Sequence, residues 1–212
     1  LNIPAVGMLQ KYTPERFLEL LHNTGFTTFN KKADYYGLSL ILGGGETSLW
    51  DLTGVYASLS RVLGRYNNEK KYIKEDYHQP LLLTKDIQPE LSSVEGNPPL
   101  SAGSIWLTYE ALRKVNRPET ETGWQYFASD PELAWKTGTS FGFRDAWAVG
   151  TTPDYVIGVW AGNADGEGRP GLTGISAAAP VLFEIVGIMN PVPWFAPPYE
   201  EMTTVSVCSQ SG

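Results

Sequence analysis

The spacing of apolar residues predicts two short helices at the start of the chain. Within residues 2–10, apolar side chains recur at every third position, which is a helical spacing. Thr13 is a suitable cap for a second helix, Pro14 suits its first position, and Gly25 is a typical stop. We interpret both segments as helices that pack against the rest of the domain.

Two longer helical patterns follow. After Ser48, apolar side chains repeat at steps of three and four residues as far as Leu63, and residues 101–115 show a similar face. A run of three glycines at 43–45 precedes the first of them. A phosphate-binding loop would need a lysine after its glycines, and none follows. A close approach of the backbone to a neighbouring element is therefore the better interpretation.

The second half of the chain has the pattern of an antiparallel sheet. Residues 132–138, 143–149 and 155–161 are short apolar runs that predict three strands. Turn residues separate them, at Gly142 and at 152–154. Three strands joined by tight turns predict an antiparallel meander, with the first strand free to form an edge.

A glycine-rich loop at 162–174 and an apolar helix at 175–189 complete the pattern. Helices, then strands, then one helix predict an α+β domain in which helices pack on the antiparallel sheet. We expect this domain to span residues 1–190. The proline-rich segment 191–204 is predicted to be a linker, and residues 205–212 the start of a further β domain.

Composition narrows the classes of function. With 212 residues, 42% of them hydrophobic, the chain is able to bury one ordinary core. The net charge is -7, and the basic cluster at 70–74 is followed at once by acidic residues, which argues against nucleic-acid binding. The single cysteine, Cys208, excludes an internal disulfide, and no long apolar run predicts a membrane span. Because the chain lacks an initiator methionine, begins inside an apolar segment and ends on what resembles the start of another strand, we expect it to be a piece of a longer polypeptide.

The sequence Lys136-Thr137-Gly138-Thr139 is the strongest candidate for chemistry. A lysine within an apolar strand must be paired, reach solvent or serve a ligand, because an unpaired buried ammonium is costly. The two threonine hydroxyls are suited to binding a carboxylate beside that cation. On an edge strand, the free backbone groups of Thr139 are able to hold an extended peptide, and its N–H to stabilise an oxyanion. The alternative is a surface lysine that snorkels into solvent.

The residues around this motif are candidates for supporting roles. Trp135 and Phe141 flank it and are able to line a groove. Asp145, beside Arg144, is able either to pair locally or to brace the lysine strand, and we favour bracing. The sequence indicates neither a cofactor nor a metal site.

The motif and its continuation resemble a known family. K-T-G accompanies S-x-x-K and an S-D-N-type element in penicillin-binding proteins and β-lactamases. Lys136–Thr139 and the run at 141–147 resemble the transpeptidase domain of the class A bifunctional penicillin-binding proteins, as do segments 1–6, 38–59 and 112–118. The resemblance implies an α+β fold of the penicillin-binding/β-lactamase-like transpeptidase type, with its N-terminal part missing.

The same resemblance implies the chemistry. A serine of S-x-x-K, upstream of residue 1, would attack the penultimate D-alanine carbonyl of a peptidoglycan stem peptide and form an acyl-enzyme. Asn2, as the asparagine of S-x-N, would orient substrate or hydrogen-bond the catalytic lysines. Lys136 would supply positive potential and proton-relay contacts, and the Thr139 N–H would form half of the oxyanion hole. Substrate binding is implied for the whole stretch of Thr137, Gly138, Thr139, Ser140 and Phe141, with Trp135 and Asp145 as structural support.

The implied partners are peptidoglycan stem peptides ending in D-Ala-D-Ala, β-lactam antibiotics and the N-terminal part of the same protein. The implied location is periplasmic, with the full-length protein anchored by an upstream segment. The 212 residues contain no S-x-x-K, so we expect the chain to be inactive by itself.

Two alternatives belong to other classes. A non-enzymatic penicillin-recognising or cell-wall-binding module would keep the sheet and lack the nucleophile. A serine β-lactamase would need a well-placed deacylating base, and no glutamate element of that kind is recognisable in the sequence.

Overall fold

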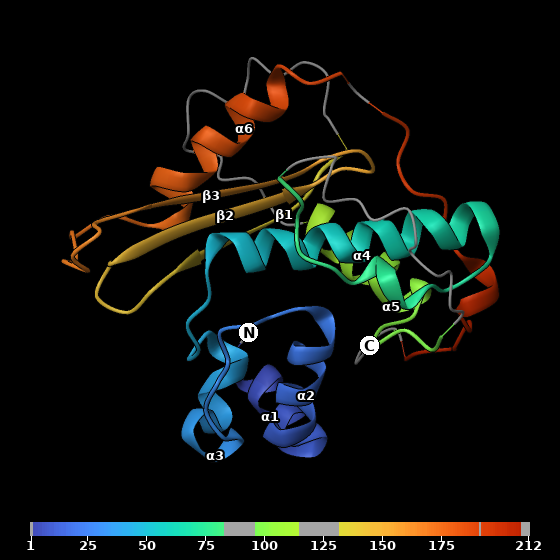
Figure 1. The fold of residues 1–212 in the computed structure, drawn as a ribbon, viewed down its shortest axis with the longest axis horizontal. Helices are drawn as coiled ribbons and strands as arrows, with labels where there is room; N and C mark the ends of the chain where they lie inside the picture. Colours follow the sequence, from blue (N-terminus) through green and yellow to red (C-terminus); the bar gives the residue numbers. More distant parts are fainter. Residues whose placement is uncertain (1, 83–95, 115–131, 191, 209–212) are drawn as a thin grey trace.

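The computed structural model describes residues 2–82, 96–114, 132–190 and 192–208 (Figure 1). Four elements form the lower lobe in Figure 1 and enclose a small core around Leu9 and Phe29. They are α1 (Asn2–Tyr12), α2 (Pro14–Thr24), α3 (Ala33–Tyr36) and the 3-10 helix η1 (Gly37–Leu42). The long helix α4 (Leu49–Glu69) follows and runs beneath the sheet, and the short 3-10 helix η2 (Lys74–Asp76) comes after it.

A three-stranded antiparallel sheet is the centre of the second lobe. Its strands β1 (Ala134–Thr139), β2 (Asp145–Thr151) and β3 (Val156–Gly162) are arranged in the order β1-β2-β3. The registers pair Thr139 with Ala146 and Trp147 with Trp160. Within the described chain, β1 is therefore an edge strand.

Helices cover both faces of the sheet (Figure 1). On one face, α4 and α5 (Ala102–Arg113) share a core with Ala134. On the other face, the π-helical turn η5 (Gly174–Ala178) leads directly into α6 (Ala179–Gly187), and this helix buries Trp135 and Ile157. Successive strand residues point to opposite faces, so β1 contributes to both cores, whereas β3 contributes to the core under α6 and contacts α4 with its other face.

The structure confirms the predicted elements and shows how they are capped. Thr13 accepts a hydrogen bond from the Arg16 N–H, and Gly25 ends α2 in the left-handed conformation at φ 110°. Ser48 and Ser101 cap α4 and α5 in the same way as Thr13 caps α2. Gly44 lies so close to Ser39, and Gly45 so close to Phe29, that any side chain there would collide, which confirms the predicted close approach at these two glycines, whereas a Cβ on Gly43 would meet no atom within 4 Å.

The proline-rich segment after α6 packs on the helices. Phe195 is buried among residues of α4 and α5. The Trp106 indole N–H donates to the Phe195 carbonyl at 3.3 Å, and the Trp194 indole N–H donates to Glu110 at 2.9 Å. The segment ends with a short 3-10 helix, η6 (Tyr199–Glu201), and residues 202–208 form no regular element. The predicted domain boundaries remain predictions, and residues 209–212 lie outside the described part of the chain.

None of the helices in the described ranges combines the length and the hydropathy that crossing a bilayer requires.

Candidate functional site

The sheet register turns the backbone of the Lys-Thr-Gly-Thr motif toward the open edge. The Ser140 N–H donates to the Asp145 carbonyl at 3.0 Å, so these two residues form a hydrogen-bonded pair at the end of the ladder. Hydrogen-bonded pairs alternate with non-bonded pairs along an antiparallel ladder. The N–H and C=O groups of Thr137 and Thr139 therefore point away from β2 and are available to an added strand.

Lys136 places a positive charge beside this edge. Its side chain is exposed and lies on the α4 and α5 face of the sheet, as Ala134 does. The Nζ donates to the Thr137 carbonyl, and no carboxylate of the described residues lies within ion-pair distance of it. The ammonium therefore stays close to the backbone of the motif, and none of the described carboxylates neutralises it.

The Thr139 hydroxyl accepts a hydrogen bond from the start of η5. Its Oγ1 accepts a hydrogen bond from the Gly174 N–H at 2.9 Å, at the first residue of η5. A hydroxyl has one hydrogen to donate in addition to its acceptor lone pairs. Among the described residues no acceptor receives that hydrogen, so Thr139 can donate it to a bound group.

The turn after β1 is closed by Ser140 and Asp145. The Ser140 Oγ accepts from the Asp145 N–H at 2.8 Å, while Asp145 Oδ1 accepts from the Trp160 indole N–H at 2.9 Å. The Asp145 carboxylate thus links β2 to β3, and its backbone closes the turn next to the motif. Phe141, at the tip of this turn, is 97% exposed.

Trp135 belongs to the core. It is 1% exposed and meets the Phe183 ring edge-on, with the ring centres 5.0 Å apart. The alternative in which Trp135 lines a groove is therefore wrong. The reason is the alternation along β1, which turns Trp135 toward α6 and away from solvent.

Asn2 lies apart from the motif. It is exposed and begins α1, which packs on η1 and α2 in the lower lobe (Figure 1). Strand β1 instead packs on β2, α5 and η5. No hydrogen bond among the described residues joins Asn2 to the motif, so the structure does not bring these predicted site residues together.

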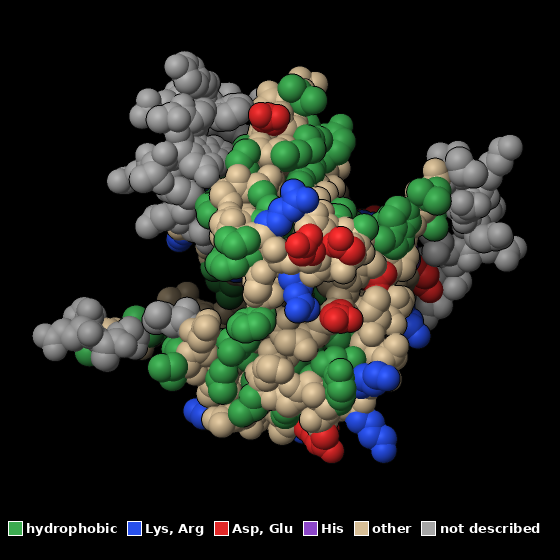
Figure 2. Space-filling model, turned by 90° about the vertical axis from the view of Figure 1, so that its left-hand side faces the viewer, with side chains coloured by type: hydrophobic (Ala, Val, Ile, Leu, Met, Phe, Trp, Pro, Cys, Tyr) green, Lys and Arg blue, Asp and Glu red, His purple; other side chains and the backbone are tan. Residues whose placement is uncertain are grey.

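Charges of both signs lie at the end of the sheet that carries the β1-β2 turn. The β1-β2 turn and the loop after β3 meet there, and the Arg169 N–H donates to the Phe143 carbonyl at 3.0 Å. The exposed charged residues of the two segments are Arg144, Asp165, Glu167 and Arg169. In Figure 2, which views the molecule from this side, Lys/Arg and Asp/Glu side chains gather near the middle, with hydrophobic side chains above and below.

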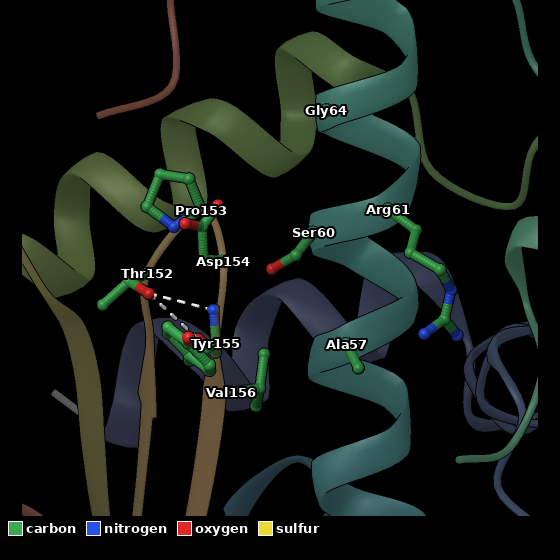
Figure 3. A pocket seen from close by; sticks show the side chains of 9 residues that line it. All are labelled: Ala57, Ser60, Arg61, Gly64, Thr152, Pro153, Asp154, Tyr155 and Val156. Carbon is green, nitrogen blue, oxygen red and sulfur yellow. Dashed lines mark hydrogen bonds between the residues drawn. The ribbon is translucent and has the colours of Figure 1, made fainter. Parts of the chain in front are cut away.

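A hollow of about 270 Å³ lies at the other end of the sheet, between α4 and the β2-β3 turn (Figure 3). The Arg61 side chain lies on the far side of the helix, where its guanidinium donates to the carbonyls of Asp76 and His78. Burial lowers the pKa of this guanidinium. The Ser60 hydroxyl is hydrogen-bonded to the Tyr109 hydroxyl at 3.1 Å. Arg61 and Ser60, which α4 contributes to this hollow, are thus already hydrogen-bonded, and the β1 edge is the better candidate site.

Gly174 and Trp160 were not predicted as site residues from the sequence. A glycine at the first position of an apolar helix was the only local signal for Gly174. Its partner lies 35 positions earlier in the chain, so the contact appears only in the folded structure.

Comparisons with known proteins place the chain in a family. No family model matches it. Penicillin-binding protein 1C of Escherichia coli is 33% identical over 189 residues, which cover 89% of this chain and 22% of that protein. Penicillin-binding protein 1A of Neisseria flavescens is 28% identical over 152 residues, or 71% of this chain and 18% of that protein. The chain therefore spans about a fifth of the length of these curated relatives.

A solved structure supports the same placement. The crystal structure of penicillin-binding protein 1A from Haemophilus influenzae matches with a TM-score of 0.62 and 18% identity, over 93% of this chain and 34% of that chain. The chain belongs to the class A penicillin-binding proteins and has part of their transpeptidase fold. Within this class, its similarity to penicillin-binding protein 1C extends over most of its length. The family and fold predicted from the sequence are confirmed.

Proposed function

We propose that the chain forms one side of the acyl-transfer site of a peptidoglycan D,D-transpeptidase. The observation that carries this proposal is the edge of β1, where two outward-facing backbone N–H groups, a hydroxyl with a free hydrogen and an unneutralised ammonium lie within four residues. These groups suit an extended peptide that ends in a carboxylate. The family relationship supplies the reaction class.

The reaction needs a nucleophile that this sequence does not contain. A serine Oγ from the upstream part of the same protein attacks the penultimate D-alanine carbonyl, and its proton passes to a neighbouring base. The amide bond to the terminal D-alanine breaks, and that residue leaves with a proton on its amine. The amine of a neighbouring stem peptide then attacks the ester, forms the cross-link and regenerates the serine.

The residues of this chain bind and stabilise. The Thr139 N–H donates to the oxyanion, while the hydroxyls of Thr137 and Thr139 donate to the terminal carboxylate. Lys136 adds positive potential beside both groups, and Gly138, Ser140 and Phe141 border the bound peptide. Asn2 begins the helical lobe, apart from the motif, and is not one of these groups. A β-lactam is attacked by the same serine.

This function also defines the setting of the domain. Peptidoglycan is assembled outside the cytoplasmic membrane, so we place the domain in the periplasm, held to the inner membrane by an upstream segment. Residues 191–204 then lead from the transpeptidase domain toward a small β domain that begins near residue 205.

A fluorescent penicillin tests the proposal. The longer polypeptide that contains this chain should form a covalent adduct that survives denaturing electrophoresis, and its S-x-x-K serine→Ala variant should not. The 212-residue chain should stay unlabelled, because it lacks the serine. Absence of labelling in the longer protein, under conditions where a known penicillin-binding protein labels, would refute the transpeptidase and favour a non-enzymatic binding module.

A further inference from the structure

The first residue of η5 touches the motif through its backbone. The Gly174 N–H donates to Thr139 Oγ1 at 2.9 Å. Because η5 continues into α6, this contact links the helix that covers one face of the sheet to Thr139, the last residue of the motif. Among the described residues, this is the only hydrogen bond that the Thr139 side chain makes.

Only glycine fits at this position. A Cβ on Gly174 would lie 2.5 Å from the Gly138 carbonyl oxygen, 2.5 Å from the Trp147 carbonyl oxygen and 2.9 Å from the Thr137 Cβ. Two of these atoms belong to the backbone of the β1-β2 ladder, which cannot move aside without loss of pairing. Any side chain at residue 174 would therefore push η5 away from Thr139.

The helix start is itself fixed in place. Thr173 Oγ1 accepts from the Ser176 N–H at 3.2 Å, and Ser176 Oγ accepts from the Thr173 N–H at 3.2 Å, which is a complete capping box. Ser176 Oγ also bonds to the Gly171 carbonyl at 3.0 Å. The Gly174 N–H is thus held at a defined position before any ligand arrives.

We propose that Gly174 is a positioning residue that makes Thr139 selective for a carboxylate. Its N–H occupies the acceptor side of the Thr139 hydroxyl, so the hydroxyl hydrogen points outward, toward the substrate. In this orientation Thr139 donates to an anionic terminus and gains little from a neutral ester or amide at the same place. This inference rests on the proposed function, which assigns the terminal carboxylate to Thr139, and it adds the residue that orients the Thr139 hydroxyl.

The test compares two acylating agents in the longer protein, a penicillin with its free carboxylate and the methyl ester of that penicillin. The measured quantity is the ratio of their acylation rates. Thr139→Val removes the hydroxyl at nearly constant shape, and we expect the ratio to fall about ten- to a hundredfold, the range for losing one hydrogen bond to a charged group. Gly174→Ala should lower the ratio in the same direction while the rate with the ester changes little.

The double variant separates positioning from general damage. If Gly174 acts through Thr139, Gly174→Ala should have no further effect on the ratio in the Thr139→Val background. Gly7→Ala is the matched control, because a Cβ there meets no atom within 4 Å, and its ratio should equal that of the wild type. An equal loss with both penicillins, or additive losses in the double variant, would overturn the positioning role.

Thr173 provides a second variant that acts on the same helix start. Should Gly174→Ala fail to fold, Thr173→Ala loosens the same helix start by removing the capping oxygen, and should lower the ratio, with Thr173→Ser restoring it. An unchanged ratio in Thr173→Ala would count against the inference. A wild-type protein that neither penicillin acylates would instead overturn the proposed function, whereas an acylated wild type with insensitive variants would overturn the positioning role alone.

Discussion

At the scale of single residues, Lys136 combines exposure with the lack of a carboxylate partner among the described residues. A structural lysine on a strand would gain from an ion pair, whereas a lysine that serves a ligand stays without one until the ligand arrives. The position of its Nζ over the Thr137 carbonyl keeps the charge next to the edge groups. The residue is therefore expected to matter for function and to contribute little to stability.

Replacing Lys136 tests this expectation. In the longer protein, Lys136→Ala should slow acylation by penicillin at least about tenfold, because a charged hydrogen-bonding group is lost at the site. Unfolding free energy should change by less than about 0.5 kcal/mol, as for other exposed substitutions. Lys32→Ala, an exposed lysine at the start of α3, is the control and should leave both quantities unchanged. A wild-type acylation rate in Lys136→Ala would show that the motif has another role.

At the scale of elements, helix α4 and strand β3 show how the sheet depends on a close contact between a strand backbone and helix side chains. Gly158 of β3 faces Leu49 and Thr53 of α4, and a Cβ there would lie closer to Thr53 than any real contact allows. The position of β3 in turn sets the position of β2 and β1 through the ladder. The α4 surface thus determines indirectly where the edge strand lies.

Gly158→Ala should therefore destabilise the chain by about 1–3 kcal/mol, the usual cost of forcing extra atoms into a packed site. Gly7→Ala in α1 is the opposite case. It adds the same methyl group to open space within a helix, and is expected to stabilise by up to about 1 kcal/mol through helix propensity. Urea unfolding of the two variants and the wild type measures both effects. Equal midpoints for all three proteins would contradict the contact between α4 and β3.

At the scale of the whole molecule, the core beneath the sheet is rich in tyrosine. Burial raises the pKa of Tyr77 to about 12 and also raises the pKa values of Tyr72 and Tyr109. The Tyr109 hydroxyl bonds to Ser60, and the Tyr72 hydroxyl accepts from the Ala102 N–H at 2.8 Å. These groups join α4 and α5 and the segment after η2, so their ionisation affects the whole second lobe.

The protein should lose stability in alkali above the ordinary tyrosine pKa. A folded-state pKa above the unfolded value of 10.0 means that the folded chain keeps protons that the unfolded chain has released. The stabilisation is complete below pH 10 and is lost as the pH rises toward about 12 for Tyr77. Urea midpoints across this range should fall, and they should fall less steeply in Tyr77→Phe. Parallel curves for the two proteins would contradict the burial of this hydroxyl.

The helices and strands, and the residue types of the candidate site, could be predicted from the sequence. Helix caps such as Thr13, Ser48 and Ser101 act on amides two or three positions away, so their effect can be predicted locally. Short apolar runs between turn residues predicted three strands, and the Lys-Thr-Gly-Thr motif indicated a cationic, hydroxyl-bearing edge. These features depend on residues that are neighbours in the chain.

Only the tertiary structure decided which groups of that edge are available. The ladder register turns the backbone of Thr137 and Thr139 outward, and strand alternation buries Trp135 against Phe183. The start of η5 holds the Thr139 hydroxyl across 35 positions of sequence. Contacts of this kind arise from how the sheet and helices pack, because the direction of a hydrogen bond depends on the placement of both partners. The residue types at the site were therefore readable from the sequence, whereas their orientation required the fold.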